Sequence, residues 1–390
     1  MLDRALDPVC NIALRSPTML NPQHVRRPTR DAIEDMDLPV PEKAFVARAP
    51  CRVDLAGGTL DLDPLYRFLG GAVTVNAAIS VTARARLRPR ADAAIVLRSA
   101  DLDAEVSFAG LDELTRRLAR TPPPPLALLA RAVAFWAPGS GLELETTSEA
   151  PRGSGLGGSS ALLVATLGAL HTAFGAPAHL GTGNVDASAL CRFAAGIEAR
   201  HLEVPVGTQD YLAALHGGAL ALHYGLEGLR RVLRLPESVL DWLEERLLVF
   251  YSGEAHFSGA PNWDVLRRYV ERDPATRGAI AAIASIAQRL AAALERGDTS
   301  RVAERVNEEW TQRCRLSEQI CPPALGELIE ALRRAGASAV KACGAGGGGS
   351  VLALAPPASH AAICAAASTH GARRLPCRIV RQGLQTGGPR

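Results

Sequence analysis

The run of residues 151–160, Pro-Arg-Gly-Ser-Gly-Leu-Gly-Gly-Ser-Ser, constrains the fold more than any other part of this 390-residue sequence. It holds four glycines and three serines and leads into an alanine- and leucine-rich segment, Ala161 to Leu170, whose spacing is typical of a buried helix. The pattern predicts a glycine loop that opens a helix. The glycines let the backbone approach a ligand, and the first helical turn offers unpaired N–H groups at the positive end of the helix dipole. A phosphate is the natural ligand, and the hydroxyls of Ser159 and Ser160 can bind a cation or cap the helix, although a flexible turn with an ordinary N-cap explains the same composition.

Composition indicates a globular protein and excludes several classes of partner. With 47% hydrophobic and 21% charged residues, the chain has enough apolar material for two cores, so we expect two domains. The net charge of +3 is small and the basic residues are dispersed, which disfavours nucleic-acid or membrane binding. The eight cysteines form no Cys-x-x-Cys pair and no zinc-like spacing with histidine. We therefore expect reduced, mostly buried thiols and a cytoplasmic protein, without a run of about 18 apolar residues or a signal peptide.

An acidic glycine loop is expected near the beginning of the folded part. The first 43 residues show no sustained period, so we predict a poorly ordered extension there. A strand-like run at residues 45–53 is followed by Asp54-Leu-Ala-Gly-Gly-Thr-Leu-Asp-Leu-Asp-Pro64. Glycines and three carboxylates after a strand predict a sharp turn that presents acids. Carboxylates accept hydrogen bonds from hydroxyls, which suits a sugar, although an acidic surface turn explains the same residues.

Two further acids stand at the ends of predicted helices. Residues 187–202 carry an apolar stripe with Glu198 beside it. The turn Pro205-Val-Gly-Thr-Gln-Asp210 brings Gln209 and Asp210 to the head of another apolar segment. Asp210 is therefore either an N-cap or a base.

Alternating and β-branched residues predict the strands. In the first half these are residues 72–88, whose arginines we expect on a solvent-exposed face, and 142–147, with a helix at 126–136 after four prolines. From about residue 262 to 335 the chain reads as helical. The other elements expected in the second half are strands at 247–251, 339–343, 350–355 and 374–381, a helix at 358–369 and a second glycine loop at 344–349. A change of composition near residues 225–245 predicts the domain boundary.

The order of these motifs is more specific than any of them alone. A-P-C-R-V-D-L-A-G-G with Asp61 downstream, P-R-G-S-G-L-G-G-S-S-A, V-G-T-Q-D with A-L-H-G-G after it, and K-A-C-G-A-G-G-G-G resemble the GHMP kinase superfamily over residues 44–382. The loop of residues 57–64, which we call the sugar loop, and the Val206–Asp210 run are most similar to the sugar-kinase branch of heptose 7-phosphate kinases and L-fucose kinases. The resemblance implies an α+β, two-layer fold of two domains. These would be an N-terminal ribosomal-protein-like domain, residues 44–235, and a C-terminal ferredoxin-like domain, residues 236–390, with the active site in the cleft between them.

The resemblance also implies the roles of individual residues. ATP phosphates would lie in the glycine loop, which is not a Walker A loop because it has no Gly-Lys-Ser or Gly-Lys-Thr. Asp210 matches the family's catalytic acid, which takes or orients the proton of the attacking sugar hydroxyl, and Arg52 matches an arginine that keeps this carboxylate ionised. Mg²⁺ would be held by Ser159, with Ser160 close by, and by Glu198. The residues implied for ATP are Pro151, Gly153, Ser154, Gly155, Leu156, Gly157, Gly158, Ser159 and Ser160, and those for the substrate are Gly57, Gly58, Thr59, Asp61, Gln209, Gly346 and Gly347.

The implied activity is that of an ATP- and Mg²⁺-dependent kinase acting on a small-molecule sugar or sugar phosphate, with a homodimer left open. The alternatives are a GHMP kinase for a non-sugar alcohol such as mevalonate or homoserine, a relative of the diphosphate decarboxylases, and a non-catalytic sugar or nucleotide sensor on the same scaffold. The sensor is disfavoured because Asp210, Glu198 and the loop serines are all present. Two positions depart from the family pattern: Gly158 stands where the first serine is usual, and Asp63 adds an acid to the sugar loop, where we expect it to affect specificity.

Overall fold

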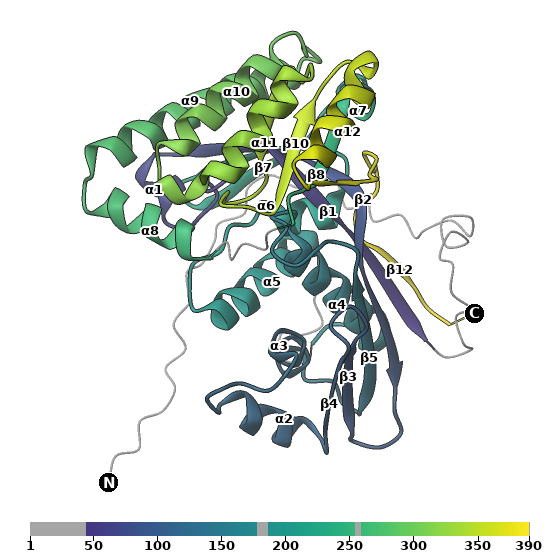
Figure 1. Ribbon diagram of the computed structural model, residues 1–390. Helices are drawn as coiled ribbons and strands as arrows, with labels where there is room; N and C mark the ends of the chain where they lie inside the picture. Colours follow the sequence, from purple (N-terminus) through teal and green to yellow (C-terminus); the bar gives the residue numbers. More distant parts are fainter. Residues whose placement is uncertain (1–43, 178–185, 254–258, 390) are drawn as a thin grey trace. The chain divides into compact units, whose positions relative to one another are not determined.

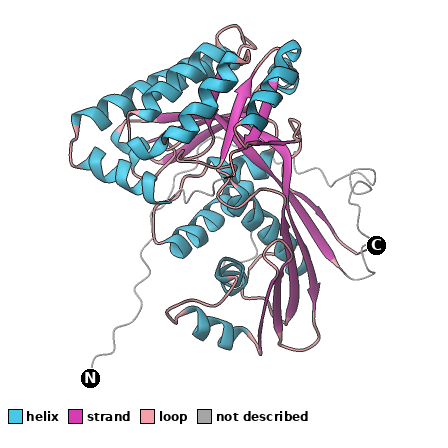
Figure 2. Cartoon of the chain, viewed as in Figure 1, coloured by secondary structure: helices cyan, strands magenta, loops and turns pink. Residues whose placement is uncertain are grey.

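The computed structural model describes residues 44–177, 186–253 and 259–389. The predicted extension, residues 1–43, lies outside the described residues. All described residues fall in one unit of tertiary contacts. Within it, Figures 1 and 2 show two sheets, each accompanied by its own helices.

The first sheet has eight strands in the order β12-β1-β2-β5-β3-β4, with β6 on β2 and β7 on β6. All pairings are antiparallel except the one between β3 and β5. The strands are β1 (Phe45–Ala56), β2 (Ala72–Pro89), β3 (Ile95–Ser99), β4 (Ala104–Phe108), β5 (Leu142–Ser148), β6 (Ala219–Gly225), β7 (Gly228–Arg234) and β12 (Gln385–Gly387).

The long strand β2 organises this sheet. One edge pairs with β1, while the other pairs with β6 along residues 72–77 and with β5 along residues 83–89. Between these two partners, the amide of Ser80 donates to the carbonyl of Arg378 at 2.9 Å and the amide of Val380 donates to the carbonyl of Ala78 at 3.0 Å. The C-terminal part of the chain therefore fills the gap on β2.

Helices cover one side of the first sheet (Figure 2). The helix α4 (Gly158–Phe174) packs against β1 and β2, and α3 (Ala127–Trp136), α5 (Ala187–Leu202) and α6 (Gln209–His216) pack around it. Ten residues of α4 are buried, which explains why its sequence is apolar all round. Two short helices, α1 (Leu65–Phe68) and α2 (Leu111–Leu118), complete this half.

The second sheet has four antiparallel strands in the order β11-β8-β10-β9. Its strands are β8 (Leu247–Tyr251), β9 (Ala339–Ala342), β10 (Ser350–Leu354) and β11 (Arg373–Leu375). In chain order this is the strand order 4-1-3-2 of the ferredoxin-like fold that the resemblance implied. The helices of this half are α7 (Glu237–Arg246), α8 (Gly259–Val270), α9 (Pro274–Leu294), α10 (Val302–Cys314), α11 (Pro323–Arg334) and α12 (His360–Thr369), with 3-10 turns at Glu318–Ile320 and Pro357–Ser359.

The last predicted strand, residues 374–381, is wrong in extent. β11 ends at Leu375, and beyond it only Ile379 forms an isolated bridge, with Ile79 of β2. The chain changes sheets here, because Arg378 and Val380 bond to β2 and β12 then pairs with β1. The division at residues 235 and 236 falls between β7 and α7 and stays a prediction, since β12 returns to the first sheet.

Among the described helices, α9 is the one long and apolar enough to cross a membrane by length and composition. It packs against β2 and α10, and Ile280, Ile283 and Leu290 are buried in those contacts. The seven described cysteines are free thiols. Cys51, Cys191 and Cys343 are buried and the other four are partly exposed, so the expectation that most of the thiols are buried is wrong.

Candidate active site

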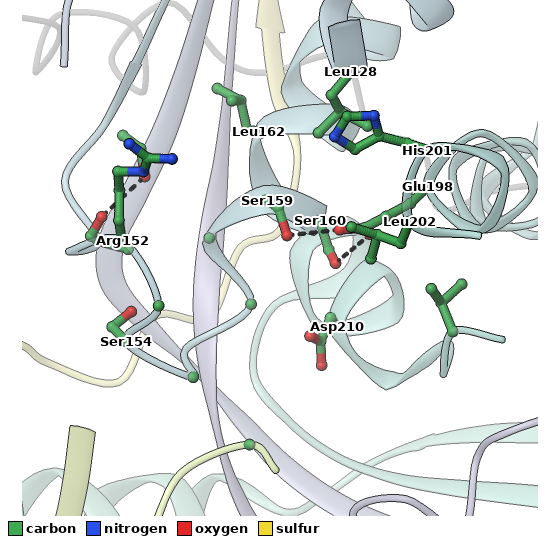
Figure 3. A pocket seen from close by; sticks show the side chains of 18 of the residues that line it. Leu128, Arg152, Ser154, Ser159, Ser160, Leu162, Glu198, His201, Leu202 and Asp210 are labelled. Carbon is green, nitrogen blue, oxygen red and sulfur yellow. Dashed lines mark hydrogen bonds between the residues drawn. The ribbon is translucent and has the colours of Figure 1, made fainter. Parts of the chain in front are cut away.

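A pocket of about 640 Å³ lies where the glycine loop, the loop after β1, the beginning of α6 and the Gly344 loop meet. Figure 3 shows one side of it, with Ser159, Ser160 and Glu198 in the middle, Leu128, Leu162 and His201 on one side and Asp210 on the other. We call the part lined by the leucines the apolar end. We call the part that contains Asp61 and Asp210 the acidic end.

The glycine loop approaches its neighbours too closely for side chains. Gly153, Gly155 and Gly157 have φ values of 65°, 72° and 73°, which favour glycine. A Cβ on Gly155 would lie 2.5 Å from the carbonyl oxygen of Cys343, and a Cβ on Gly157 would lie 3.0 Å from Oδ2 of Asp210. Gly157 is also the N-cap of α4, which begins at Gly158, three residues before the predicted apolar segment. The loop thus presents the N-terminus of α4 to the pocket with backbone alone.

Glu198 of α5 gathers three hydroxyl groups. Ser159 and Ser160 donate to its carboxylate at 2.6 Å and 3.0 Å, and the hydroxyl of Tyr211 donates to Oε2. Burial raises the pKa of Glu198, while the hydrogen bonds from these hydroxyls oppose the shift. The described residues contain no group of three or more His, Cys, Asp or Glu side chains that could hold a metal ion. A cation at this place would need oxygens from its ligand in addition to Ser159 and Glu198, and that is how Mg²⁺ binds with nucleotide phosphates.

Asp210 and Arg52 form an ion pair beside the glycine loop. Arg52 lies on β1 and is buried, and its Nε and Nη2 reach Oδ1 of Asp210 at 2.7 Å and 2.6 Å. Its Nη1 donates to the carbonyl of Gly155 at 2.6 Å. One guanidinium therefore ties the carboxylate to the loop. Asp210 is the second residue of α6 and its side chain is 23% exposed, so it remains open to the pocket.

Asp61 forms the other carboxylate of the acidic end. Its Oδ2 accepts a hydrogen bond from the amide of Gln209 at 2.9 Å. It lies so close to Gly207 that a Cβ there would be 2.1 Å from Oδ2. Burial raises the pKa of Asp61 to about 6; the Gln209 hydrogen bond lowers it, and the charge of Asp210 raises it.

A buried charge network supports this end from behind. Lys341 of β9 donates to Asp54 and to Glu309, each at 2.8 Å, and Asp54 also accepts from the amide of Gly344 at 2.9 Å. Arg313 pairs with Glu309 and donates to the carbonyl of Gly58 at 2.8 Å and to Oγ1 of Thr59 at 3.2 Å. The nearby cations hold the pKa of Asp54 well below its usual range despite burial. The network therefore fixes the sugar loop of the first half to β9 and α10.

Most of the predicted site residues meet in this pocket. Gly58, Thr59, Asp61, Gln209, Asp210, Arg52, Glu198 and the loop residues other than Leu156 all line it. Four predicted residues are not among the lining residues: Gly57, Leu156, Gly346 and Gly347.

Contacts elsewhere in the structure explain why these four predicted residues do not line the pocket. The side chain of Leu156 is buried in the core. A Cβ on Gly57 would lie 2.3 Å from the carbonyl oxygen of Val73, and Gly346 and Gly347 contact Ile320. Instead of the last two, Gly344 and Ala345 face the pocket.

The two departures from the family pattern have local explanations. Asp63 is paired with Arg67 and accepts from the hydroxyl of Tyr66 at 2.8 Å, with a side chain 53% exposed. It does not line the pocket, so the expected effect on specificity has no support. At position 158, a Cβ would lie 3.0 Å from the Cβ of Ala150, which is a tight contact that glycine avoids.

The sequence did not reveal the apolar end. It is lined by residues of the β3–β4 turn, of the segment before α3, of the beginning of α3, of α4 and of the end of α5: Leu102, Pro123, Pro124, Leu126, Leu128, Leu162, His201 and Leu202. Four successive prolines marked one of these segments as a loop. Nothing in their local pattern indicates that the loop faces a ligand.

Comparison with known families explains why these features occur together. Residues 126–218 match the model of the GHMP kinases N terminal domain, and residues 290–372 match that of the GHMP kinases C terminal domain. The chain contains both domains of the GHMP kinases. The L-fucokinase/L-fucose-1-P guanylyltransferase of Bacteroides fragilis is 26% identical over an alignment of 373 residues, which covers 87% of this chain and 38% of that protein. The D-glycero-alpha-D-manno-heptose 7-phosphate kinase of Campylobacter jejuni is 26% identical over 323 residues, 79% of this chain and 88% of that protein.

The GHMP kinase fold extends over the described structure. A D-glycero-D-manno-heptose 1-phosphate kinase of Bacteroides thetaiotaomicron superposes with a TM-score of 0.65 and 21% identity, covering 88% of this chain and 98% of that one. Lactococcus lactis galactokinase complexed with galactose gives 0.68 and 17%, covering 91% and 98%. The chain spans only 38% and 31% of the first two curated relatives, the Bacteroides protein and a bifunctional fucokinase/GDP-fucose pyrophosphorylase of Arabidopsis thaliana.

Proposed function

We propose that this GHMP kinase transfers the γ-phosphoryl group of ATP to a hydroxyl of a sugar of the heptose or fucose type, in the cytoplasm and with Mg²⁺. The observation that carries the proposal is the position of Asp210. Its Oδ1 is held by Arg52 at 2.7 Å, and its Oδ2 lies against Gly157 at the N-terminus of α4. An acid next to a phosphate-binding helix end is what phosphoryl transfer to an alcohol requires.

The two ends of the pocket fit the two substrates. The backbone of the glycine loop and the N–H groups of the first turn of α4 suit the phosphates of ATP, which leaves the apolar end for the nucleoside. Thr59, Asp61 and Gln209 offer a hydroxyl, a carboxylate and an amide at the acidic end, and such groups recognise sugar hydroxyls. Similarity to a fucokinase and to a heptose phosphate kinase supports a sugar over another alcohol.

The chain contributes positioning and charge more than covalent chemistry. Arg52 holds Asp210 in place, so that Oδ2 can receive the proton of the attacking hydroxyl without a change of rotamer. Ser159 and Glu198 supply the protein oxygens for the cation, and Tyr211 orients the carboxylate of Glu198. When bound there, Mg²⁺ supplies neutralisation of the charge on the phosphate oxygens. The loop amides stabilise the same charge.

The test is the substitution Asp210→Asn, which retains an oxygen for Arg52 but removes the base. We expect ATP binding, followed by calorimetry, to persist while kcat for ADP release falls by about 10²- to 10⁴-fold, the size typical of a general base. The matched control is Asp63→Asn, which removes an exposed carboxylate that is bound by Arg67 outside the pocket. Turnover of the Asp210 variant within a few-fold of the control would exclude Asp210 from the reaction.

A further inference from the structure

The acidic end of the pocket has little positive charge to offer a substrate. Among the lining residues that the structure describes, the arginines are Arg52 and Arg152, and none is a lysine. Arg152 lies across the glycine loop from Asp210, away from the acidic end (Figure 3). Arg52 already contacts Asp210 with Nε and Nη2 and the Gly155 carbonyl with Nη1.

The cations behind the acidic end are also bound to carboxylates. Lys341 is fully buried between Asp54 and Glu309, and Arg313 is buried against Glu309. Three cations, Lys341, Arg313 and Arg52, are thus paired with three carboxylates, those of Asp54, Glu309 and Asp210. Asp61 adds a fourth carboxylate, which has no cation of its own. The surroundings of the acceptor therefore carry one negative charge in excess when all groups are ionised.

The polar atoms facing the acceptor need hydrogen-bond donors. Oε1 of Gln209 is buried and has no partner among the described residues, and Gln209 lines the pocket. Asp61 presents a carboxylate that accepts, from the described donors, the amide of Gln209. A sugar hydroxyl can donate to the carboxylate of Asp61, whereas a phosphate dianion offers only acceptors.

From these observations we infer that the acidic end takes an uncharged sugar and discriminates against the phosphate ester of that sugar. The inference rests on the proposed kinase function and narrows its substrate class. A phosphate ester would bring a double negative charge toward the carboxylates of Asp61 and Asp210. No described cation nearby is free to bind that charge, because each one is already paired with a carboxylate. Sites that select sugar phosphates instead supply arginine or lysine for the ester. Relatives of both substrate types are found, a fucokinase and a heptose 7-phosphate kinase, so sequence similarity alone does not decide between them.

The experiment compares matched pairs of acceptors with the full-length protein, ATP and Mg²⁺. Each pair consists of a free sugar and the ester with phosphate on its terminal carbon: D-glycero-D-manno-heptose and its 7-phosphate, mannose and its 6-phosphate, and galactose and its 6-phosphate. L-Fucose is included as a free sugar. ADP release gives kcat/KM, and phosphorus NMR identifies the product. We expect turnover with at least one free sugar and a kcat/KM about 100-fold lower for its ester, an effect of the size expected from one uncompensated charge at close range.

The outcomes separate this inference from the proposed function. Equal or faster turnover of a phosphate ester would overturn the inference while leaving the protein a kinase. If none of the acceptors, free or phosphorylated, supports ADP release, the proposed function and the inference are both overturned.

A variant tests whether Asp61 is the cause of the discrimination. Asp61→Asn removes the unpaired charge but keeps an oxygen for the Gln209 amide. We expect it to raise KM for the free sugar and to lower the preference for the free sugar over its ester by about 10-fold. Asp63→Asn, which removes an equal charge outside the pocket, should leave that preference unchanged. An unchanged preference in the Asp61 variant would contradict the assigned role of this carboxylate.

Discussion

Two glycines at opposite ends of α4 allow the closeness of the glycine loop to Asp210 to be tested. Gly157 precedes the helix and Gly175 follows it, and both have a φ of 73°. Gly157, with a ψ of 28°, is in the left-handed helical region, where alanine costs about 1–2 kcal/mol. Gly175, with a ψ of −162°, is in a region that is essentially restricted to glycine and costs another residue about 1–3 kcal/mol. A Cβ on Gly157 would lie 3.0 Å from Oδ2 and 3.1 Å from Cγ of Asp210, whereas a Cβ on Gly175 would meet nothing within 4 Å. Both alanine variants thus strain the backbone, Gly175→Ala at least as much as Gly157→Ala, but only Gly157→Ala touches the proposed base.

We expect Gly157→Ala to lose about 1 kcal/mol of unfolding free energy and Gly175→Ala at least as much, seen as a fall in Tm of about 2 °C or more by circular dichroism. Gly157→Ala must in addition displace Asp210, which Arg52 holds in place. At a contact of 3.0 Å the carboxylate must move by a few tenths of an ångström, whereas a misplacement of 1 Å costs about 100-fold in rate. In a coupled assay of ADP release, kcat should therefore fall about 10-fold in Gly157→Ala and stay near wild type in Gly175→Ala. Equal kcat values in the two variants would refute the geometry described for Asp210.

Three further predictions concern charges at and behind the pocket. Glu198→Gln should raise the Mg²⁺ concentration needed for half-maximal activity by at least about 10-fold, and an unchanged Mg²⁺ titration would put the cation elsewhere. Because burial raises the folded-state pKa of Asp61 to about 6 from 3.8, its neutral form stabilises the fold at low pH, and this stability is lost as the pH rises through 6. Urea unfolding should therefore show Asp61→Asn more stable than wild type by up to about 3 kcal/mol at pH 8, with little difference at pH 4; a difference independent of pH would contradict the shift. Lys341→Met leaves Asp54 buried without its ion-pair partner and Glu309 with Arg313 alone, and it should lower the urea-unfolding free energy by about 3–5 kcal/mol, whereas a loss below about 1 kcal/mol would mean that other groups compensate.

The sequence predicted those parts of the fold whose signal is local. The glycine loop and α4 follow from residues 151–170, and β1, β2, β5, β8, β9 and β10 fall within a few residues of the predicted strands. The end of the chain was predicted less well, because residues 376–387 leave the second sheet and bond to the first one, where Arg378 and Val380 fill the gap along β2. No local pattern encodes that gap.

The same distinction between features with a local sequence signal and features that depend on tertiary structure applies to the site. The residues named in advance lie in glycine-rich or acidic motifs, and those lining the pocket include Asp61, Asp210, Arg52 and Glu198. The apolar end was missed because leucines of α3, α4 and α5 have the same spacing whether they face a core or a ligand. Asp63 was predicted to affect specificity because it is an acid in a loop with other candidate site residues. Its ion pair with Arg67, four residues later, depends on the helical turn of α1, which the sequence did not predict.

The two ends of the pocket differ in what they are made of, and this bears on how such an enzyme can change during evolution. The part around residues 153–158 depends on Gly155, Gly157 and Gly158, where an added Cβ would lie 3.0 Å or less from a neighbouring atom, so few substitutions are tolerated there. The opposite part is formed by the side chains of Thr59 and Leu62, on the loop after β1 that Arg313 and Lys341 anchor from behind, and by that of Asn262 on α8. Substitutions during evolution can therefore change the specificity for the molecule that accepts the phosphoryl group, while the specificity for the phosphoryl donor is conserved.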